Sequence, residues 1–162
     1  MRTHLNAKPQ KPQRVVVMGA GGFVGKTITE QLQAAGVEVL ALGRGDVDLL
    51  APGADKVLAA LLKPTDAFVA VSALAPVKNV EMLGQNITMI SAMASALAAV
   101  TPAYVLNIGS DAVFGDEPLP LTEAAPKAPG AFHGVMHVAR EVAFAELSFP
   151  VGTLRPILIY GA

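Results

Sequence analysis

A short apolar run followed by three regularly spaced glycines narrows the choice of folds more than any other part of this chain. Residues 15–18 read VVVM, a β-branched run typical of a strand that is buried on both faces. Gly19 then lets the chain turn sharply, Gly22 lets backbone N–H groups approach a pyrophosphate, and Gly25 lets a following helix pack close against the sheet. This order of strand, glycines and helix predicts a dinucleotide-binding turn.

The tip of the next predicted strand bears on which dinucleotide fits. Residues 37–42 read VEVLAL and predict a strand about twenty residues beyond the glycines. NAD-specific domains place an acid at this tip to bind the ribose hydroxyls, whereas an arginine suits the 2′-phosphate of NADP. Here the tip carries Arg44, and the nearest acid is Asp46. We expect NADP or NAD, with NADP favoured and Arg44 as the phosphate clamp; the alternative is a solvated Arg44.

Strand-like segments alternate with helical patterns along the rest of the chain. Further strands are expected at 66–71, 104–108 and 151–160, with a short strand or strand-like turn at 46–50, and helices at 23–35, 55–62, 81–100 and 132–147. This alternation predicts an α/β fold, a Rossmann-type doubly wound parallel sheet of about six strands in a three-layer α/β/α arrangement.

Composition excludes several classes of partner. A formal net charge of −1 with 15% charged residues predicts neither a nucleic-acid nor a membrane-surface partner. Polar residues interrupt the apolar run 86–103, which favours a buried helix over a membrane span. The absence of cysteine suits a reducing cytoplasm. Residues 1–14 carry four basic residues and no acid, so we expect a flexible basic tail before one domain over 15–162.

Three later segments carry a more specific pattern: GSDAVFGD at 109–116, PLTEAAPKAP at 120–129 and LRPILIYG at 154–161. With the glycine spacing, they resemble the extended short-chain dehydrogenase/reductase family, which includes nucleotide-sugar epimerases, dehydratases and dTDP-4-dehydrorhamnose reductases. The resemblance implies an NAD(P)-binding Rossmann domain and hydride transfer on a nucleotide sugar or a similar hydroxyl or keto metabolite. The residues expected to contact the cofactor are Gly19, Gly22, Phe23, Val24, Gly25, Arg44, Asp48, Leu49, Ser72, Ala73, Asn86 and Pro156.

The resemblance also implies a Ser/Thr–Tyr–Lys catalytic set, and here the sequence departs from the family. In that set the tyrosine is the acid/base, the lysine lowers its pKa, and the hydroxyl residue orients the substrate. Ser110 falls on the hydroxyl position, but His133 stands where the tyrosine is expected and His137 where the lysine is expected. The two tyrosines of the chain, Tyr104 and Tyr160, lie on predicted strands without a lysine four residues later.

Several interpretations of this departure are open. His133 can serve as the acid/base, since imidazole titrates near neutral pH without help, with His137 in a supporting role; we favour this interpretation. Catalysis can instead be lost, which leaves a nucleotide-binding sensor or assembly partner. His133, His137 and Glu141 also have a helical spacing competent for zinc, but the family does not otherwise use metals and we expect none. The histidines can also be plain polar residues beside a cleft.

Other expectations concern charges and assembly. Arg140 and Glu141 are adjacent on a helix and are expected to form a solvated pair. For Arg155 we weigh two roles alike, a structural arginine or a neighbour of the nicotinamide. Relatives continue beyond the motif at 154–161, so we expect the C-terminal substrate lobe to be absent or truncated in this chain. Relatives also pair through their two long helices, so we expect a homodimer through 81–100 and 132–147.

Overall fold

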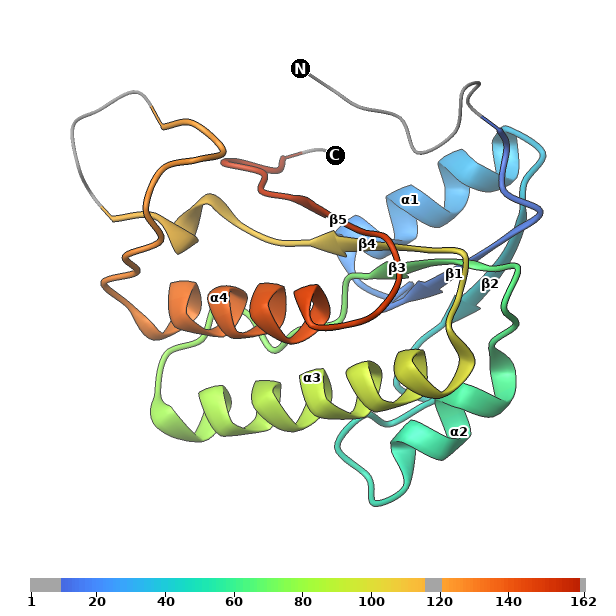
Figure 1. Cartoon of the computed structure of the whole chain (residues 1–162), viewed down its shortest axis with the longest axis horizontal. Coiled ribbons are helices and arrows are strands. Elements are labelled where there is room, and N and C mark those ends of the chain that lie inside the picture. The colour runs from blue at the N-terminus through green and yellow to red at the C-terminus, as the bar shows by residue number, and fades with distance from the viewer. Residues whose placement is uncertain (1–9, 116–120, 161–162) are drawn as a thin grey trace.

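A single parallel sheet forms the centre of the molecule in the computed structural model, which describes residues 10–115 and 121–160 (Figure 1). Its five strands lie in the order β2-β1-β3-β4-β5 and all pairs are parallel. The predicted fold class is therefore confirmed, with five strands. They are β1 (Arg14–Met18), β2 (Glu38–Leu42), β3 (Ala67–Ala70), β4 (Tyr104–Ile108) and β5 (Val151–Leu154).

Helices cover the sheet on both faces (Figure 1). On one face α1 (Phe23–Ala34) packs over β1 and β2, and on the other face lie α2 (Ala54–Leu61), α3 (Val80–Val100) and α4 (Phe132–Ala145). A short 3₁₀ helix, η1 (Asp111–Val113), precedes the loop to α4. Because side chains alternate along a strand, β1 supplies both cores: Val15 and Val17 pack toward α1, while Val16 and Met18 belong to the larger core under α2 and α3.

Two segments differ from the predicted strands. The stretch 46–50 takes the alternative form, a turn, in which the backbone N–H groups of Asp46 and Val47 both donate to the carbonyl of Gly43. The last strand, expected over 151–160, ends at Leu154. Pro156 lacks the N–H that a continuing ladder requires, and its carbonyl accepts from Asp111 N instead, at 3.3 Å.

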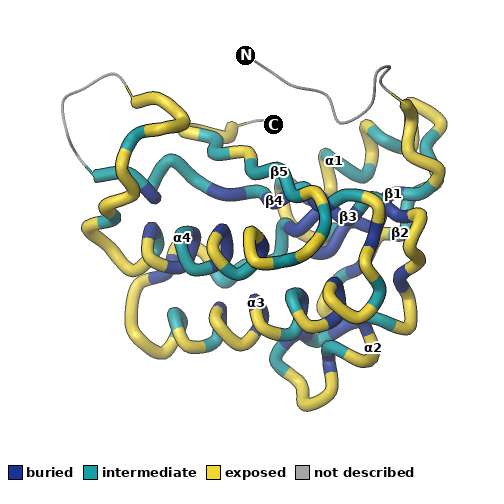
Figure 2. The backbone as a smooth tube through the Cα atoms, in the orientation of Figure 1, coloured by how far each residue is buried: buried dark blue, intermediate teal, exposed yellow. Residues whose placement is uncertain are grey.

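The long helix α3 is apolar but belongs to the core. Within the described part of the chain it is the one helix long and apolar enough to cross a membrane by length and composition, which is weak evidence because core helices pass the same test. Met93 and Leu97 on one side of α3 are fully buried in the larger core. The opposite side of α3 is exposed (Figure 2). This arrangement is that of a helix covering a sheet.

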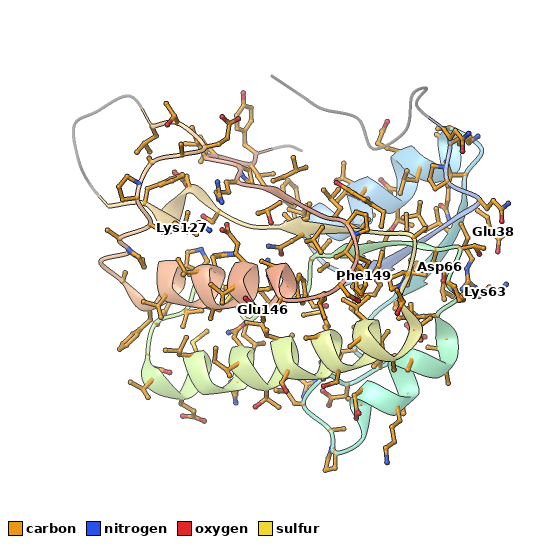
Figure 3. The ribbon with its side chains drawn as sticks, in the orientation of Figure 1. Glu38, Lys63, Asp66, Lys127, Glu146 and Phe149 are labelled. Atoms are coloured by element: carbon orange, nitrogen blue, oxygen red, sulfur yellow. The ribbon has the colours of Figure 1, made fainter. Side chains whose placement is uncertain are left out.

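An ion pair lies at the end of the sheet where the strands begin, opposite their carboxyl ends. Arg14 donates to both oxygens of the fully buried Asp66, at 2.9 and 2.7 Å, and also to the carbonyl of Leu61. The carboxylate of Asp66 also accepts from the backbone N–H of Lys63, its neighbour at this end of the molecule in Figure 3. The pair therefore joins the start of β1, the end of α2 and the start of β3.

The predicted basic tail is partly integrated into this fold. Residues 1–9 lie outside the described residues. Lys11 donates through Nζ to the carbonyls of Ala35 and Gly36, at 2.6 and 2.9 Å, and so satisfies carbonyl groups at the C-terminal end of α1. Arg14 is already part of β1.

Candidate cofactor and active site

The glycine loop has the geometry for which glycine is required. Gly19 directly follows β1 and adopts φ +102°, in the left-handed region, and its N–H donates to the carbonyl of Leu42 at 2.8 Å. A Cβ on Gly19 would lie 2.7 Å from the backbone nitrogen of Ser72. A Cβ on Gly25 would clash with the carbonyl oxygen of Gly19. The close packing predicted for Gly25 is therefore packing of α1 against the loop itself.

Helix α1 begins at this loop, and its N-terminus has no side-chain cap. The N-cap residue is Gly22. The N–H groups of the first helical turn, from Phe23 to Gly25, have no acceptor within the helix and carry partial positive charge. A Cβ on Gly22 would meet only the carbonyl of Gly19, at 3.5 Å. This loop and helix end fit the pyrophosphate of a dinucleotide.

A cleft of about 580 Å³ opens beside the loop, at the carboxyl ends of β1, β2 and β3. It lies where the strand order reverses between β1 and β3, the place at which open α/β sheets bind ligands. Most of the predicted cofactor residues line it. They are Gly19, Gly22, Phe23, Val24, Arg44, Asp48, Leu49, Ser72 and Ala73, and the sequence analysis missed the neighbouring Leu74, Ala75 and Met89.

The tip of β2 brings an arginine and an acid to the cleft together. The guanidinium of Arg44 lies 3.4 Å from Asp48 Oδ2, and its side chain is 76% exposed. The other oxygen of Asp48 accepts from the backbone N–H of Leu50 at 3.1 Å, which holds the carboxylate in the turn. Asp46 accepts from the N–H of Gly43 at 2.8 Å. Arg44 is thus exposed beside the cleft and paired with Asp48 by long contacts, whereas both acids also accept hydrogen bonds from the backbone.

Gly25, Asn86 and Pro156 do not line the cleft, and cofactor contact by these residues stays a prediction. The buried amide of Asn86 accepts from the N–H of Leu74 and donates to its carbonyl, both at 3.0 Å, and donates to the carbonyl of Met82 at 2.8 Å. Asn86 therefore fixes the segment after β3 that forms one wall of the cleft.

The hydroxyl of Ser110 lies at the start of η1, just after β4. It accepts from Ala112 N at 3.1 Å and donates to Asp111 Oδ1 at 3.2 Å. Helix η1 packs tightly on the first turn of α4, where a Cβ on Gly134 would clash with the carbonyl oxygen of Ala112. The fold therefore brings the segment of Ser110 and the start of the histidine helix together.

The two histidines of α4 lie against each other, His137 buried and His133 half-buried. The rings of His133 and His137 meet edge to face, with centroids 4.7 Å apart and an interplanar angle of 85°. Both Nδ1 atoms are buried and find no hydrogen-bond partner among the described residues. Burial, the charge of Arg140 and the neighbouring His133 lower the pKa of His137 to about 3. Burial and Arg140 also lower the pKa of His133, against an opposing effect of Asp111. Both imidazoles are therefore neutral at pH 7.

Arg140 is buried, so the prediction of a solvated Arg140–Glu141 pair is wrong. The side chain of Arg140 donates to the carbonyl of Ser72 at 3.0 Å and to that of Ile108, and the residue is 1% exposed. The helical spacing contained the signal, because Met136 and Phe144 lie one turn before and one turn after it and are fully buried as well.

Glu141 faces two cations rather than the histidines. Its carboxylate lies 2.7 and 2.9 Å from Arg155 and 2.6 Å from Lys127, which Figure 3 places on the loop beside α4. Arg155 also lies over the ring of Phe114, 5.4 Å from its centroid, which favours the structural role for this arginine. Within the described ranges no group of three His, Cys, Asp or Glu is arranged to hold a metal, and Glu141 is not available to complete a site with the histidine pair.

Comparison with known proteins shows which protein family has this fold and cleft. The family model of the NAD dependent epimerase/dehydratase family matches residues 15–162, and the chain belongs to that family. The resemblance seen in the sequence motifs is thereby confirmed. No curated protein matches the sequence.

Solved structures with the same fold include enzymes that carry nicotinamide cofactors. UDP-N-acetylglucosamine 4-epimerase from Bacillus cereus aligns with a TM-score of 0.76 at 21% identity, over 88% of this chain and 52% of that one. MoeE5 in complex with UDP-glucose and NAD aligns at 0.75 and 25% identity, over 88% and 53%. dTDP-4-dehydrorhamnose reductase from Bacillus anthracis in complex with NADP aligns at 0.76 and 20% identity, over 90% and 53%. The chain thus spans about half the length of these proteins, and the predicted cofactor class, NADP or NAD, agrees with the family and with these complexes.

Proposed function

We propose that this chain binds NADP or NAD in the cleft at the carboxyl ends of β1, β2 and β3. The observation that carries the proposal is the uncapped N-terminus of α1, which follows a glycine loop at the reversal point of the sheet and borders the cleft. Arg44 would meet the 2′-phosphate of NADP, which favours this cofactor, while Asp48 and Leu49 would lie toward the adenosine end.

We further propose that the chain works as an oxidoreductase or epimerase-type enzyme on a nucleotide sugar or a similar hydroxyl or keto metabolite. The bound nicotinamide supplies hydride transfer. Ser110 would orient the reacting oxygen of the substrate, and His133, which is neutral at pH 7, would take a proton from a hydroxyl or return it to a carbonyl oxygen. His137 would support the ring of His133 through their edge-to-face contact. The substrate class is supported by the nucleotide-sugar enzymes among the structural neighbours.

A second candidate function is a non-catalytic NAD(P)-binding module. The burial of His137 favours it, because an imidazole with a pKa of about 3 does not supply the positive charge that the family's lysine contributes. A cysteine-free sequence suits a cytoplasmic location in either case, and we propose that location.

Calorimetric titration with NADPH and NADH tests the cofactor proposal first. We expect binding of both, with tighter binding of NADPH, and loss of that preference in Arg44→Ala. Lys56→Ala, which removes a cation from α2 outside the cleft, is the matched control and should bind like the parent chain. Absence of binding of either cofactor would overturn the proposal.

Catalysis is tested separately by the absorbance of the reduced cofactor with nucleotide-sugar substrates, together with product analysis for epimerisation, which causes no net redox change. His133→Ala should bind cofactor like the parent chain and abolish turnover. Turnover that persists in this variant would exclude His133 as the acid/base, and cofactor binding without any turnover in the parent chain would favour the non-catalytic module.

A further inference from the structure

Arg140 lies between the ends of two strands, and the predicted catalytic set assigns this residue no role. Its guanidinium donates to Ser72, just beyond β3, and to Ile108, the last residue of β4. Ser72 lines the cofactor cleft, and Ile108 lies two residues before Ser110. One side chain from α4 therefore bridges the two strand ends that carry the cofactor wall and the substrate-orienting hydroxyl.

Burying the charged guanidinium of Arg140 costs free energy, and no carboxylate in the described part of the chain is hydrogen-bonded to it to offset that cost. Arg140 is 1% exposed, its hydrogen bonds go to carbonyl oxygens rather than to a carboxylate, and its Nε finds no partner among the described residues. Glu141 next to it is held by Arg155 and Lys127. Burial lowers the pKa of Arg140 to about 10, so the guanidinium remains charged at neutral pH.

We propose that Arg140 is the positioning residue of this site: it locks the ends of β3 and β4 to α4 and supplies the fixed positive charge beside the histidine pair. This inference rests on the proposed function, in which His133 exchanges a proton with the substrate. In the family's usual set the cation is the lysine four residues after the acid/base. In this chain the cation stands seven residues after His133, on the buried side of the same helix.

The charges around the histidines support this role. The charged group of Arg140 disfavours protonation of both rings, whereas Asp111 of η1 acts on His133 in the opposite direction, and Glu141 does so on His137. His133 also disfavours protonation of His137 and so contributes to the lowered pKa of His137. Burial and the guanidinium of Arg140 together therefore favour the neutral form of His133, which accepts a proton.

The experiment compares histidine titration and cofactor affinity in the full chain. Ring signals of His133 and His137, assigned with single His→Gln variants, are followed by NMR against pH in the parent chain, Arg140→Met and Arg140→Lys. NADPH and NADH affinities are measured by calorimetry in the same proteins. Arg14→Met is the matched control, since it removes an arginine that also donates to a backbone carbonyl, at the opposite end of the sheet.

In Arg140→Met we expect both titration midpoints to move upward and cofactor affinity to fall about tenfold because the cleft wall is no longer fixed. Arg140→Lys should keep the midpoints, since it keeps the charge, and lose part of the affinity, since one ammonium does not replace the fork of donors. Arg14→Met should leave midpoints and affinity unchanged.

A folded Arg140→Met with the parent chain's midpoints and affinity would overturn the inference. If Arg140→Met does not fold, Arg140→Lys decides: reduced affinity with unchanged midpoints supports the role, and unchanged affinity contradicts it. A parent chain that binds neither cofactor would instead refute the proposed function, while the titration would still report whether Arg140 controls the charge of the histidines.

Discussion

Gly21 of the cofactor loop and Gly25 of the first turn of α1 have very different surroundings. Gly25 faces the carbonyl oxygen of Gly19, which belongs to the backbone and has no room to move, whereas nothing lies within 4 Å of the Cβ position of Gly21. Gly25 belongs to the predicted glycine spacing and Gly21 does not, and the packing shows that Gly25 is the one that needs the space.

Gly25→Ala should therefore destabilise the fold, by about 1–3 kcal/mol, because the added methyl group forces the loop and α1 apart. Gly21→Ala, in the loop just before α1, should leave stability within about 0.5 kcal/mol of the parent chain. Urea unfolding of the three proteins checks this, and equal stabilities of the two variants would contradict the packing described here.

His137 makes stability depend on pH through its burial. Its pKa is about 3 in the folded chain against 6.5 for an ordinary histidine, so the unfolded chain binds the proton first as the pH falls. The free energy of unfolding should fall between about pH 6.5 and 3, by at most about 1.4 kcal/mol per pH unit. Urea unfolding at pH 7.5 and 5.5 measures this slope above the range in which carboxylates titrate.

His137→Gln provides the comparison. It should reduce the slope over the same range, while the remaining slope should come from His133, whose pKa is lowered as well. A slope identical to that of the parent chain would show that His137 is not held neutral by the fold.

Residue identities could be predicted from sequence where a local motif carries them. Gly19, Arg44 and Ser72 follow directly from the turn after a strand, and all three line the cleft. Arg140 could not be predicted in this way, because its role depends on two carbonyl groups far away in the sequence, at Ser72 and Ile108. Only the folded sheet, in which β3 and β4 are neighbours, brings those groups together.

At the level of elements, Glu141 joins three segments that meet only in the folded chain. Its carboxylate binds Lys127 of the loop before α4 and Arg155 just after β5. Burial alone would raise the pKa of Glu141, but hydrogen bonds from Arg155 and Lys127 outweigh burial and lower it. The carboxylate thus remains charged and holds the loop and the end of β5 against α4.

Glu141→Gln should destabilise the chain by about 3 kcal/mol, since it leaves the Arg155 guanidinium beside a neutral amide. Lys127→Met should cost less, about 1 kcal/mol or below, because the Lys127 side chain is 35% exposed and its charge stays near water. Urea unfolding compares the two variants. A cost for Lys127→Met that equals or exceeds the cost for Glu141→Gln would contradict this hierarchy.

The elements themselves were largely predictable, and their ends were less so. Each helix begins and ends within two residues of its predicted bounds, because apolar residues repeat at helical spacing. The expected strand over 151–160 was overlong because its apolar run continues past Pro156, and an apolar run alone does not show where backbone pairing stops.

At the scale of the whole molecule, the outer sides of α3 and α4 carry exposed apolar side chains, here called the α3/α4 surface. The two helices pack side by side; Ile87 of α3 is exposed, and so are Phe132, Val135 and Val142 of α4. The predicted homodimer through 81–100 and 132–147 is our proposal for what covers this surface.

Val142→Glu should shift the protein toward the monomer in sedimentation at micromolar concentration, because it places a charge in the apolar contact. Val57→Glu on α2, at an equally exposed valine outside this surface, should leave the sedimentation unchanged. A parent chain that is strictly monomeric at that concentration would contradict the dimer.

The Arg14–Asp66 pair lies at the end of the sheet opposite the cleft. The two ends are roughly 15 Å apart along the strands. Thr65 lies on the exposed turn just before Asp66, and the chain contains no cysteine. Thr65→Cys would therefore create a unique thiol for a fluorescent label or a surface tether. A molecule held at this point would present its cleft to the solution, so that cofactor exchange could be followed one molecule at a time.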